Sequence, residues 1–120
     1  MESSIKKFED LIVWQEAMLL VEMIYSNMKN CKDFGLRDQM QRSSVSVPSN
    51  IAEGFERKTN KEFIQYLFIA KGSCGELRTQ IYLAVKVGII SAESGDGLIE
   101  QSKKVSAMLY KLIKTRKEKF

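Results

Sequence analysis

The chain has 120 residues with a formal net charge of +4, and 44% of its residues are hydrophobic. This length suits a single domain around one core, and the ordinary composition excludes a long disordered tail. Only one proline and seven glycines occur, whereas an all-β chain of this size would need turn residues at short intervals. We therefore expect a few long helices.

Motifs that would place the chain in a membrane or around a metal are missing. Residues 1–14 lack the apolar run of a signal peptide, and no uncharged 18-residue apolar segment follows. There is no histidine, and Cys31 and Cys74 stand far apart, so no structural zinc motif exists. We expect a cytoplasmic protein with no metal, no cofactor, no membrane partner and two reduced thiols.

The first predicted helix spans residues 10–30. At 100° per residue, one face carries apolar side chains at helical spacing. They are Trp14, Ala17, Met18, Val21, Ile24, Tyr25 and Met28. A second apolar row, Ile12, Leu19 and Met23, lies about 160° away on the same helix.

The second predicted helix spans residues 35–56 and must pass Pro48, which has no amide hydrogen to donate to the Ser44 carbonyl. Its apolar face comprises Leu36, Met40, Val47, Ile51 and Phe55. Two interpretations stay open. Either the helix continues with a kink at Pro48, or it breaks there and Pro48 opens a new helix.

The third and fourth predicted helices span residues 60–88 and 94–117. A capping box formed by Thr59 and Glu62 precedes the third helix, and Gly88 is a natural C-cap. The inward stripe of the third helix is Phe63, Tyr66, Leu67, Ala70, Cys74, Leu77, Ile81, Ala84 and Val85; that of the fourth is Leu98, Val105, Met108, Leu109 and Leu112. Short connections join antiparallel neighbours. The sequence therefore predicts an all-α, up-and-down four-helix bundle with a proline-kinked second helix, in one domain over residues 1–120.

The predicted bundle has more apolar surface than it can bury. The third helix carries additional rows outside its inward stripe, namely Ile64, Phe68 and Tyr82 on one flank and Ile69, Leu83 and Val87 on the other. A helix that is apolar nearly all round is covered nearly all round, so we expect a homo-oligomer. Gly72 and Gly75 would let another helix approach closely, or they ease packing inside one bundle.

The second helix has a polar stripe opposite its apolar face: Gln39, Arg42, Ser43, Ser46, Asn50, Glu53 and Arg57. One interpretation is a solvated face with an i, i+4 pair between Glu53 and Arg57. The other is that these Ser, Asn and Gln side chains, poor surface helix formers, hydrogen-bond to a neighbouring helix or subunit.

The run Q-M-Q-R-S-S-V-S-V-P-S-N-I-A-E-G, residues 39–54, resembles the signature of a family of four-helix-bundle proteins. That family is named for proteins encoded in intervening sequences of bacterial 23S ribosomal RNA genes. Phe8, Leu11 and Trp14 resemble its opening F-x-x-L-x-x-W, and Lys61-Glu62-Phe63, Ala70, Gly72-Ser73 and Glu76-Leu77 resemble its third helix. The similarity covers about residues 8–113.

The resemblance implies bundles that assemble into rings, pentamers in known relatives, with a suspected role in nucleic-acid binding. Some similar bundles are accessory proteins to the reverse transcriptases of diversity-generating retroelements. The family has no firmly assigned catalytic residues. The matched family positions, interpreted as packing or docking residues, are Trp14, Gln39, Arg42, Ser46, Pro48, Asn50, Glu53, Gly54 and Glu76.

Positive charge gathers in residues 103–119, whose net charge of +6 leaves −2 for the rest of a +4 chain. The lysines occupy one arc of the fourth helix, which can contact phosphates non-specifically. Tyr110 at its edge can stack on a base, or it packs against the protein as a lone tyrosine more often does. The predicted nucleic-acid-binding residues are Lys103, Lys104, Lys111, Lys114 and Lys117. The alternative is a solubilising face that also complements the helix dipole.

Catalytic motifs are missing from the sequence, which has no glycine-rich phosphate loop and no G-x-S-x-G. Glu53 and Glu56 have Arg57 and Lys58 beside them, which favours ion pairs over acid–base catalysis. We expect a non-enzymatic, oligomeric nucleic-acid-binding protein. The alternative is a protein-interaction scaffold or accessory subunit, for example to a retroelement reverse transcriptase, docked through the polar stripe of the second helix.

Overall fold

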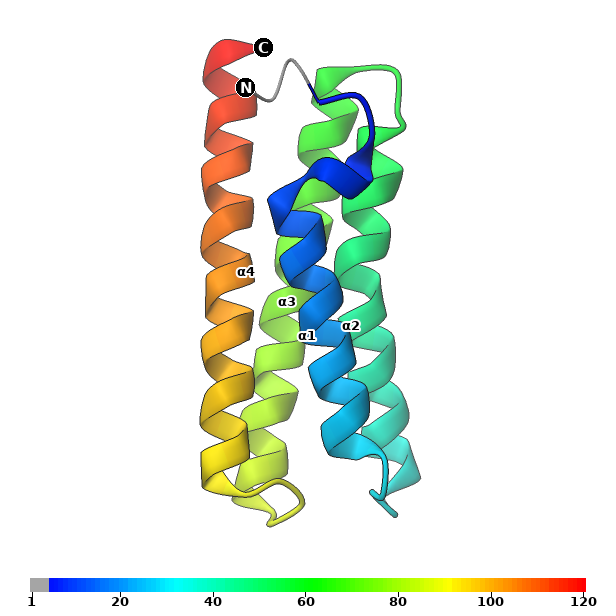
Figure 1. Ribbon diagram of the computed structural model, residues 1–120, viewed down its shortest axis with the longest axis vertical. Coiled ribbons are helices and arrows are strands. Elements are labelled where there is room, and N and C mark those ends of the chain that lie inside the picture. The colour runs from blue at the N-terminus through cyan, green and yellow to red at the C-terminus, as the bar shows by residue number, and fades with distance from the viewer. Residues whose placement is uncertain (1–4) are drawn as a thin grey trace.

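The computed structural model describes residues 5–120, which form four long antiparallel helices (Figure 1). The 3-10 turn η2, Phe8–Asp10, precedes α1, Ile12–Met28; the other helices are α2, Phe34–Phe55, α3, Asn60–Lys86, and α4, Ala92–Lys119. Each bound of α1 to α4 lies within two residues of the predicted one. No strand occurs in residues 5–120, and the predicted four-helix bundle is confirmed. Residues 1–4 of the predicted domain lie outside the described residues.

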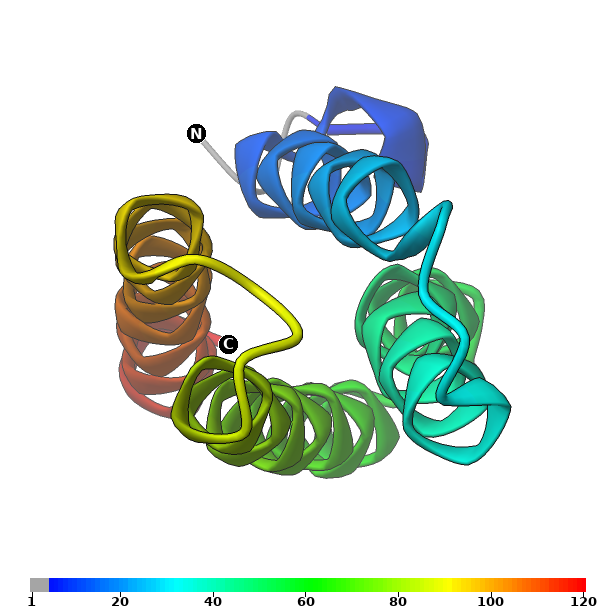
Figure 2. The ribbon, with the colours of Figure 1, turned by 90° about the horizontal axis from the view of Figure 1, so that it is seen from below.

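The helices stand in chain order around a common axis (Figure 2). Each helix packs on the next one, and α1 packs on α4 to close the bundle. Loops over residues 29–33, 56–59 and 87–91 make the three connections, and connections this short force antiparallel neighbours. The resulting rod measures 45 × 21 × 20 Å.

Side-chain caps begin α2, α3 and α4. The Asp33 carboxylate accepts from the Leu36 amide at 3.0 Å, and the Thr59 hydroxyl accepts from the Glu62 amide at 3.1 Å. At the start of α4, the Ser91 hydroxyl accepts from the Ser94 amide at 3.1 Å. After α3, Gly88 takes the left-handed conformation at φ 80° that favours glycine at a helix C-terminus. The caps predicted at Thr59 and Gly88 are therefore confirmed.

The core follows the predicted faces of α2, α3 and α4, and the prediction for α1 is wrong in its rotation. Met18 and Tyr25, expected inside, are exposed, whereas Val13 and Leu20 are buried. Because α1 is apolar nearly all round, its periodicity does not single out one inward face. The fully buried side chains along the bundle axis include Leu20, Ile24, Met28, Met40, Val47, Ile51, Leu67, Leu77, Ile81, Leu98, Val105 and Leu109.

Pro48 lies inside α2, which continues through it from Phe34 to Phe55. The interpretation in which the helix breaks at Pro48 is therefore wrong, and the kink stays a prediction. Pro48 is buried, and together with Trp14 and Met18 it lines a groove between α1 and α2. Packing against α1 therefore covers the turn of α2 in which Pro48 has no amide hydrogen to donate.

Large apolar side chains remain on the outer surface of the bundle. On α3 they are Phe68, Ile69, Tyr82 and Leu83, with Val87 directly after the helix, and on α1 they include Ile12 and Leu19. These belong to the rows predicted to exceed what one bundle can bury, but Met23 and Ile64 of those rows are partly buried against the core. Self-association itself stays a prediction. Within residues 5–120, no helix has the length and apolar character needed to cross a membrane.

Candidate functional site

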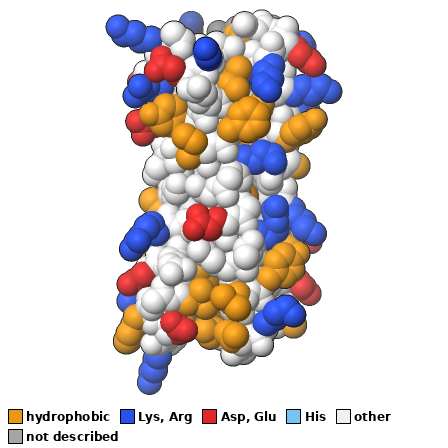
Figure 3. Space-filling model, turned by 180° about the vertical axis from the view of Figure 1, so that it is seen from behind, with side chains coloured by type: hydrophobic (Ala, Val, Ile, Leu, Met, Phe, Trp, Pro, Cys, Tyr) orange, Lys and Arg blue, Asp and Glu red, His pale blue; other side chains and the backbone are white. Residues whose placement is uncertain are grey.

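A groove between α3 and α4, which we call the basic groove, gathers cations from both helices. It has a volume of about 340 Å³. Its lining residues are Lys71 and Arg78 on α3 with Lys103, Ser106, Ala107 and Tyr110 on α4. Seen from behind, Lys and Arg side chains line the side of the molecule on which α4 lies, with hydrophobic side chains between them (Figure 3). Neither helix alone would bring these cations together.

Aromatic side chains extend the basic groove at both ends. Phe68 and Tyr82 flank Lys71 and Arg78 on α3 at spacings of three, seven and four residues, which keeps all four on one helical face. On α4, the Lys117 ammonium lies 5.0 Å from the centre of the Phe68 ring. On α3, two cations therefore lie between two aromatic rings along this face.

The cations of the basic groove are not neutralised by carboxylates. Within residues 5–120, no carboxylate lies within 4.0 Å of the charged nitrogens of Lys71, Arg78 or Lys103. The Nη1 atom of Arg78 is buried, and among the described residues it has no hydrogen-bond partner. A buried guanidinium N–H without an acceptor is unfavourable, but Nη1 is enclosed by protein, so an anion in the groove would reach it only after a movement of the Arg78 side chain.

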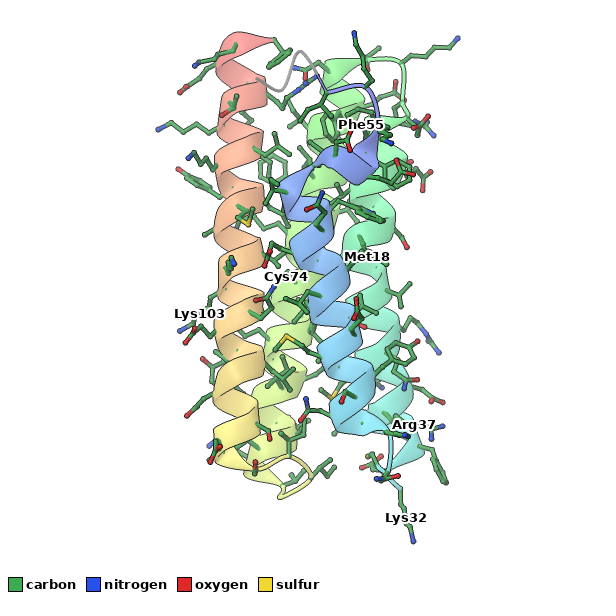
Figure 4. The ribbon with its side chains drawn as sticks, in the orientation of Figure 1. Met18, Lys32, Arg37, Phe55, Cys74 and Lys103 are labelled. Atoms are coloured by element: carbon green, nitrogen blue, oxygen red, sulfur yellow. The ribbon has the colours of Figure 1, made fainter. Side chains whose placement is uncertain are left out.

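The predicted phosphate-contacting lysines are all exposed, but they do not form one patch. Lys103 lines the basic groove and points away from the bundle (Figure 4), Lys117 contacts Phe68, and Lys114 is exposed on the outside of α4. Lys104 and Lys111 face α1 instead. The Lys104 ammonium lies 3.0 Å from Glu16 Oε1, and Lys111 lines an apolar pocket between α1 and α4.

The Glu16 carboxylate holds Lys104 on the side of α4 that faces α1. The Gln101 amide donates to Glu16 Oε1 at 3.0 Å. This hydrogen bond, followed by that from Lys104, lowers the pKa of Glu16 below its ordinary value. Glu16 is therefore a carboxylate at neutral pH, and the charge of Lys104 is less available to a phosphate than that of Lys103.

Sequence reasoning missed Lys71 and Arg78, because it searched for positive charge along α4 only. The signal was present in the spacing of Phe68, Lys71, Arg78 and Tyr82, which places two cations between two aromatic rings on one face of α3. That row was interpreted through its apolar members, as surface for self-association. Only the packing of α3 against α4 shows that it adjoins Lys103 and Tyr110.

Cys74 lies behind the basic groove, between α3 and α4 (Figure 4). Its thiol is buried and donates a hydrogen bond to the Ser102 carbonyl oxygen at 3.1 Å. Burial raises the pKa of Cys74, and the positive charges of Arg78 and Lys71 only partly oppose that effect. The thiol is therefore protonated at neutral pH, and it is not an activated nucleophile.

The polar stripe of α2 hydrogen-bonds to α3. Ser46 Oγ lies 2.9 Å from Ser73 Oγ, and the Tyr66 hydroxyl donates to the Glu53 carboxylate at 3.1 Å. Asn50 Nδ2 donates back to the Ser46 carbonyl and hydroxyl oxygens at 2.8 and 2.9 Å. The interpretation in which the stripe bonds to a neighbouring helix is confirmed for Ser46 and Glu53, whereas Asn50 bonds within α2.

The remaining part of the stripe follows the solvated interpretation. Arg57 is exposed, and it lies 3.7 Å from Glu53 and 3.1 Å from Glu62. Gln39 and Arg42 are also exposed. The stripe is thus divided between packing on α3 and contact with solvent.

Other matched family positions bring helices together. A Cβ atom at Gly54 would lie 2.6 Å from the Cβ of Tyr66 and 3.1 Å from Cδ1 of Phe63, so only glycine allows this approach of α2 to α3. Trp14 packs edge-on against Phe8, with ring centres 5.4 Å apart, in the groove that also contains Pro48. These positions are structural.

A second groove, which we call the polar groove, lies between α2 and α3 and has a volume of about 270 Å³. It is lined by Gln39, Arg42, Ser43, Ser46, Ser73 and Glu76. Four of these are matched family positions: Gln39, Arg42, Ser46 and Glu76. Within the described residues, no ion pair joins Arg42 to Glu76.

Comparison with known proteins gives a family and a fold. The family model described as 23S rRNA-intervening sequence protein matches residues 9–111. A solved structure of similar fold is that of a protein of unknown function from the S23 ribosomal protein family of Bacteroides thetaiotaomicron. The two sequences are 24% identical, the match covers 86% of this chain and 99% of that one, and the TM-score is 0.81. No curated protein matches the chain.

Proposed function

This chain belongs to the 23S rRNA-intervening sequence protein family, and on that premise we propose that it is a non-enzymatic, homo-oligomeric protein that binds the phosphate backbone of RNA or DNA. The basic groove is the observation that carries the proposal. Its three cations, Lys71, Arg78 and Lys103, come from two helices and have no carboxylate partner within residues 5–120. Binding to phosphates would release counterions without first breaking internal ion pairs.

The outer charge of α4 supports the same function. Lys103, Lys114 and Lys117 are exposed, and exposed lysines near a groove of the same sign attract a polyanion over about one Debye length. Lys104 contributes less because it pairs with Glu16. The binding surface in this proposal is therefore the α3–α4 face rather than the whole lysine arc of α4.

Self-association would multiply this surface. The exposed apolar side chains of α1 and the flank of α3 that carries Ile69 and Leu83 are large for a monomer, and covering them in a ring, which we propose to be a pentamer, would leave the α3–α4 face with Phe68 and Tyr82 free. Five copies, each with a net charge of +4, would attract nucleic acid more strongly than one copy. Light scattering after gel filtration tests this part, since a stable 13.8 kDa monomer would contradict it.

Binding of a structured RNA and a DNA duplex at low salt tests the function. The variant replaces Lys103, Lys114 and Lys117 by Gln and keeps Lys104, whose partner is Glu16, and Lys111, which faces α1. The control replaces three exposed lysines outside α4 by Gln, and these are Lys29, Lys32 and Lys58. We expect wild type and control to bind and the α4 variant to lose most of its affinity. The proposal is wrong if wild type does not bind, or if both variants weaken binding equally.

The polar groove favours a second candidate function, docking of a protein partner such as a retroelement reverse transcriptase. Arg42 and Glu76 place opposite charges on this groove, and both are exposed. A gene for a reverse transcriptase beside the gene for this chain would supply the partner to test. Substituting Arg42 and Glu76 by Ala should then abolish copurification while nucleic-acid binding is retained. If copurification persists, the polar groove is not the docking surface.

A further inference from the structure

Three aromatic rings are exposed along the basic groove and its ends. The exposed fraction of the side chain is 62% for Tyr110, 48% for Phe68 and 46% for Tyr82. Tyr110 lines the same groove as Lys71, Arg78 and Lys103. A groove that contacted only a duplex backbone would have no use for these rings, because paired bases are stacked on one another. Unpaired bases present free faces on which tyrosine and phenylalanine stack.

Arg78 lies in this groove without a competing acceptor. Its side chain is half-buried, and its Nη1 atom has no hydrogen-bond partner among residues 5–120. The titratable group behind it, Cys74, is a buried thiol and carries no negative charge at neutral pH. Arg78 is half-buried, and a movement of its side chain that exposes Nη1 would let a phosphate oxygen supply the acceptor that this atom lacks; guanidinium–phosphate bonds are among the stronger hydrogen bonds in proteins.

The two helices present matching rows along the groove. On α3, the row from Phe68 to Tyr82 spans 14 residue steps, which is about 21 Å at a rise of 1.5 Å per residue. On α4, the antiparallel row from Lys103 to Lys117 has the same length. Phe68 contacts Lys117 at one end. This is a linear site that can follow a short strand.

We propose that the basic groove prefers single-stranded RNA or DNA over a duplex, with phosphates held by Lys71, Arg78 and Lys103 and an unpaired base stacked on Tyr110. The preference rests on the proposed function, because a groove that binds no phosphate cannot select among strands. It goes beyond that function by naming the form of nucleic acid and the side chain that recognises it.

Competition between single-stranded and duplex probes tests the preference. The probes are oligouridylate, oligothymidylate and RNA and DNA duplexes of the same length, compared at one salt concentration. We expect wild type to bind the single strands more tightly, and Tyr110→Leu to weaken single-strand binding at least about fivefold, the lower range for loss of one stacked base. The ratio of single-strand to duplex affinity should fall toward one.

Two further variants separate stacking from charge. Tyr25→Leu is the matched control, because Tyr25 is also an exposed tyrosine, 44% exposed, but lies on α1. It should leave the affinity ratio unchanged. Arg78→Gln should weaken binding of both probe types. Thermal unfolding of each variant, expected to match wild type for the two exposed tyrosines, shows that the fold is intact.

The outcomes distinguish this inference from the proposed function. If single strands and duplexes bind equally and Tyr110→Leu has no effect, while the α4 lysine variant loses binding, the preference is wrong and the function stands. A preference that Tyr25→Leu reduces as much as Tyr110→Leu also overturns the assignment to Tyr110. Absence of binding to every probe contradicts both.

Discussion

The hydroxyl oxygens of Ser46 on α2 and Ser73 on α3 lie 2.9 Å apart across the contact between these helices. Ser46 Oγ also accepts a hydrogen bond from Asn50 Nδ2. Both serines line the polar groove, so the bond that joins the helices also forms its floor. Part of the stripe of small polar side chains on α2 is thereby explained as packing, and the groove above it is also lined by Gln39, Arg42 and Glu76.

Removal of this contact should destabilise the bundle modestly. Ser46→Ala and Ser73→Ala should each lower the free energy of unfolding by about 1 kcal/mol, because each leaves a part-buried hydroxyl with one partner fewer. The double variant should cost less than the sum of the two, since both remove the same bond. Urea unfolding of the four proteins in this cycle measures the coupling. Additive effects would show that the bond makes no net contribution.

Gly54→Ala should be clearly destabilising, by about 1–3 kcal/mol, because the new methyl group would overlap Tyr66 and Phe63. Gly72→Ala is the matched control on α3, where a Cβ atom meets nothing within 4 Å. It should stabilise by up to about 1 kcal/mol through helix propensity. Thermal or urea unfolding checks both changes. Equal effects at the two glycines would contradict the close approach at Gly54.

The two cysteines should differ in reactivity toward a thiol reagent. Cys31 is half-buried and should react in the folded protein, whereas buried Cys74 should react only on unfolding. Because burial raises the pKa of Cys74, the folded state holds this proton more tightly than the unfolded state. The resulting stabilisation is complete below the ordinary thiol pKa of about 8.5 and is lost as pH rises through the higher folded value. Cys74→Ala should remove the part of the stability loss at alkaline pH that comes from ionisation of this thiol. Reaction of both thiols in the folded protein would contradict the burial of Cys74.

The cap of α3 should make stability depend on acid pH. The Thr59 hydroxyl, followed by the Arg57 guanidinium, lowers the pKa of Glu62. The stabilisation that the ionised Glu62 carboxylate gives the folded state is present above the ordinary carboxyl pKa of about 4.3. It is lost as pH falls through the lower pKa of the folded state. Unfolding measured between neutral and acid pH should show a shallower dependence for Glu62→Gln. Thr59→Ala should cost about 1 kcal/mol at neutral pH, and an unchanged stability would show that the cap is dispensable.

Helical periodicity was sufficient for the fold and for most of the core. It placed the inward faces of α2, α3 and α4, where apolar side chains form a single row opposed by polar ones. It failed for α1, where Val13 and Leu20 are buried and Met18 is not, because the helix has apolar side chains in several directions. There, contacts with α2 and α4 decide the rotation.

The candidate site was predictable only in part, because it is shared between helices. The charge of residues 103–119 identified Lys103 and Lys117, but pairing of Lys104 with Glu16 depends on how α1 packs on α4. Lys71 and Arg78 belong to the groove only because α3 lies antiparallel beside α4. A property of one helix can be inferred from spacing, and a property of two packed helices cannot.

The salt dependence of binding tests the central claim, that the α3–α4 face contacts phosphates, most directly. The slope of log K against log salt concentration counts phosphates neutralised, at about 0.7 per contact for single strands. Replacement of Lys103, Lys114 and Lys117 by Gln should reduce the magnitude of this slope by up to about 2, while replacement of Lys29, Lys32 and Lys58 should leave it unchanged. An unchanged slope in the α4 variant, or an equal decrease in both variants, would contradict the claim.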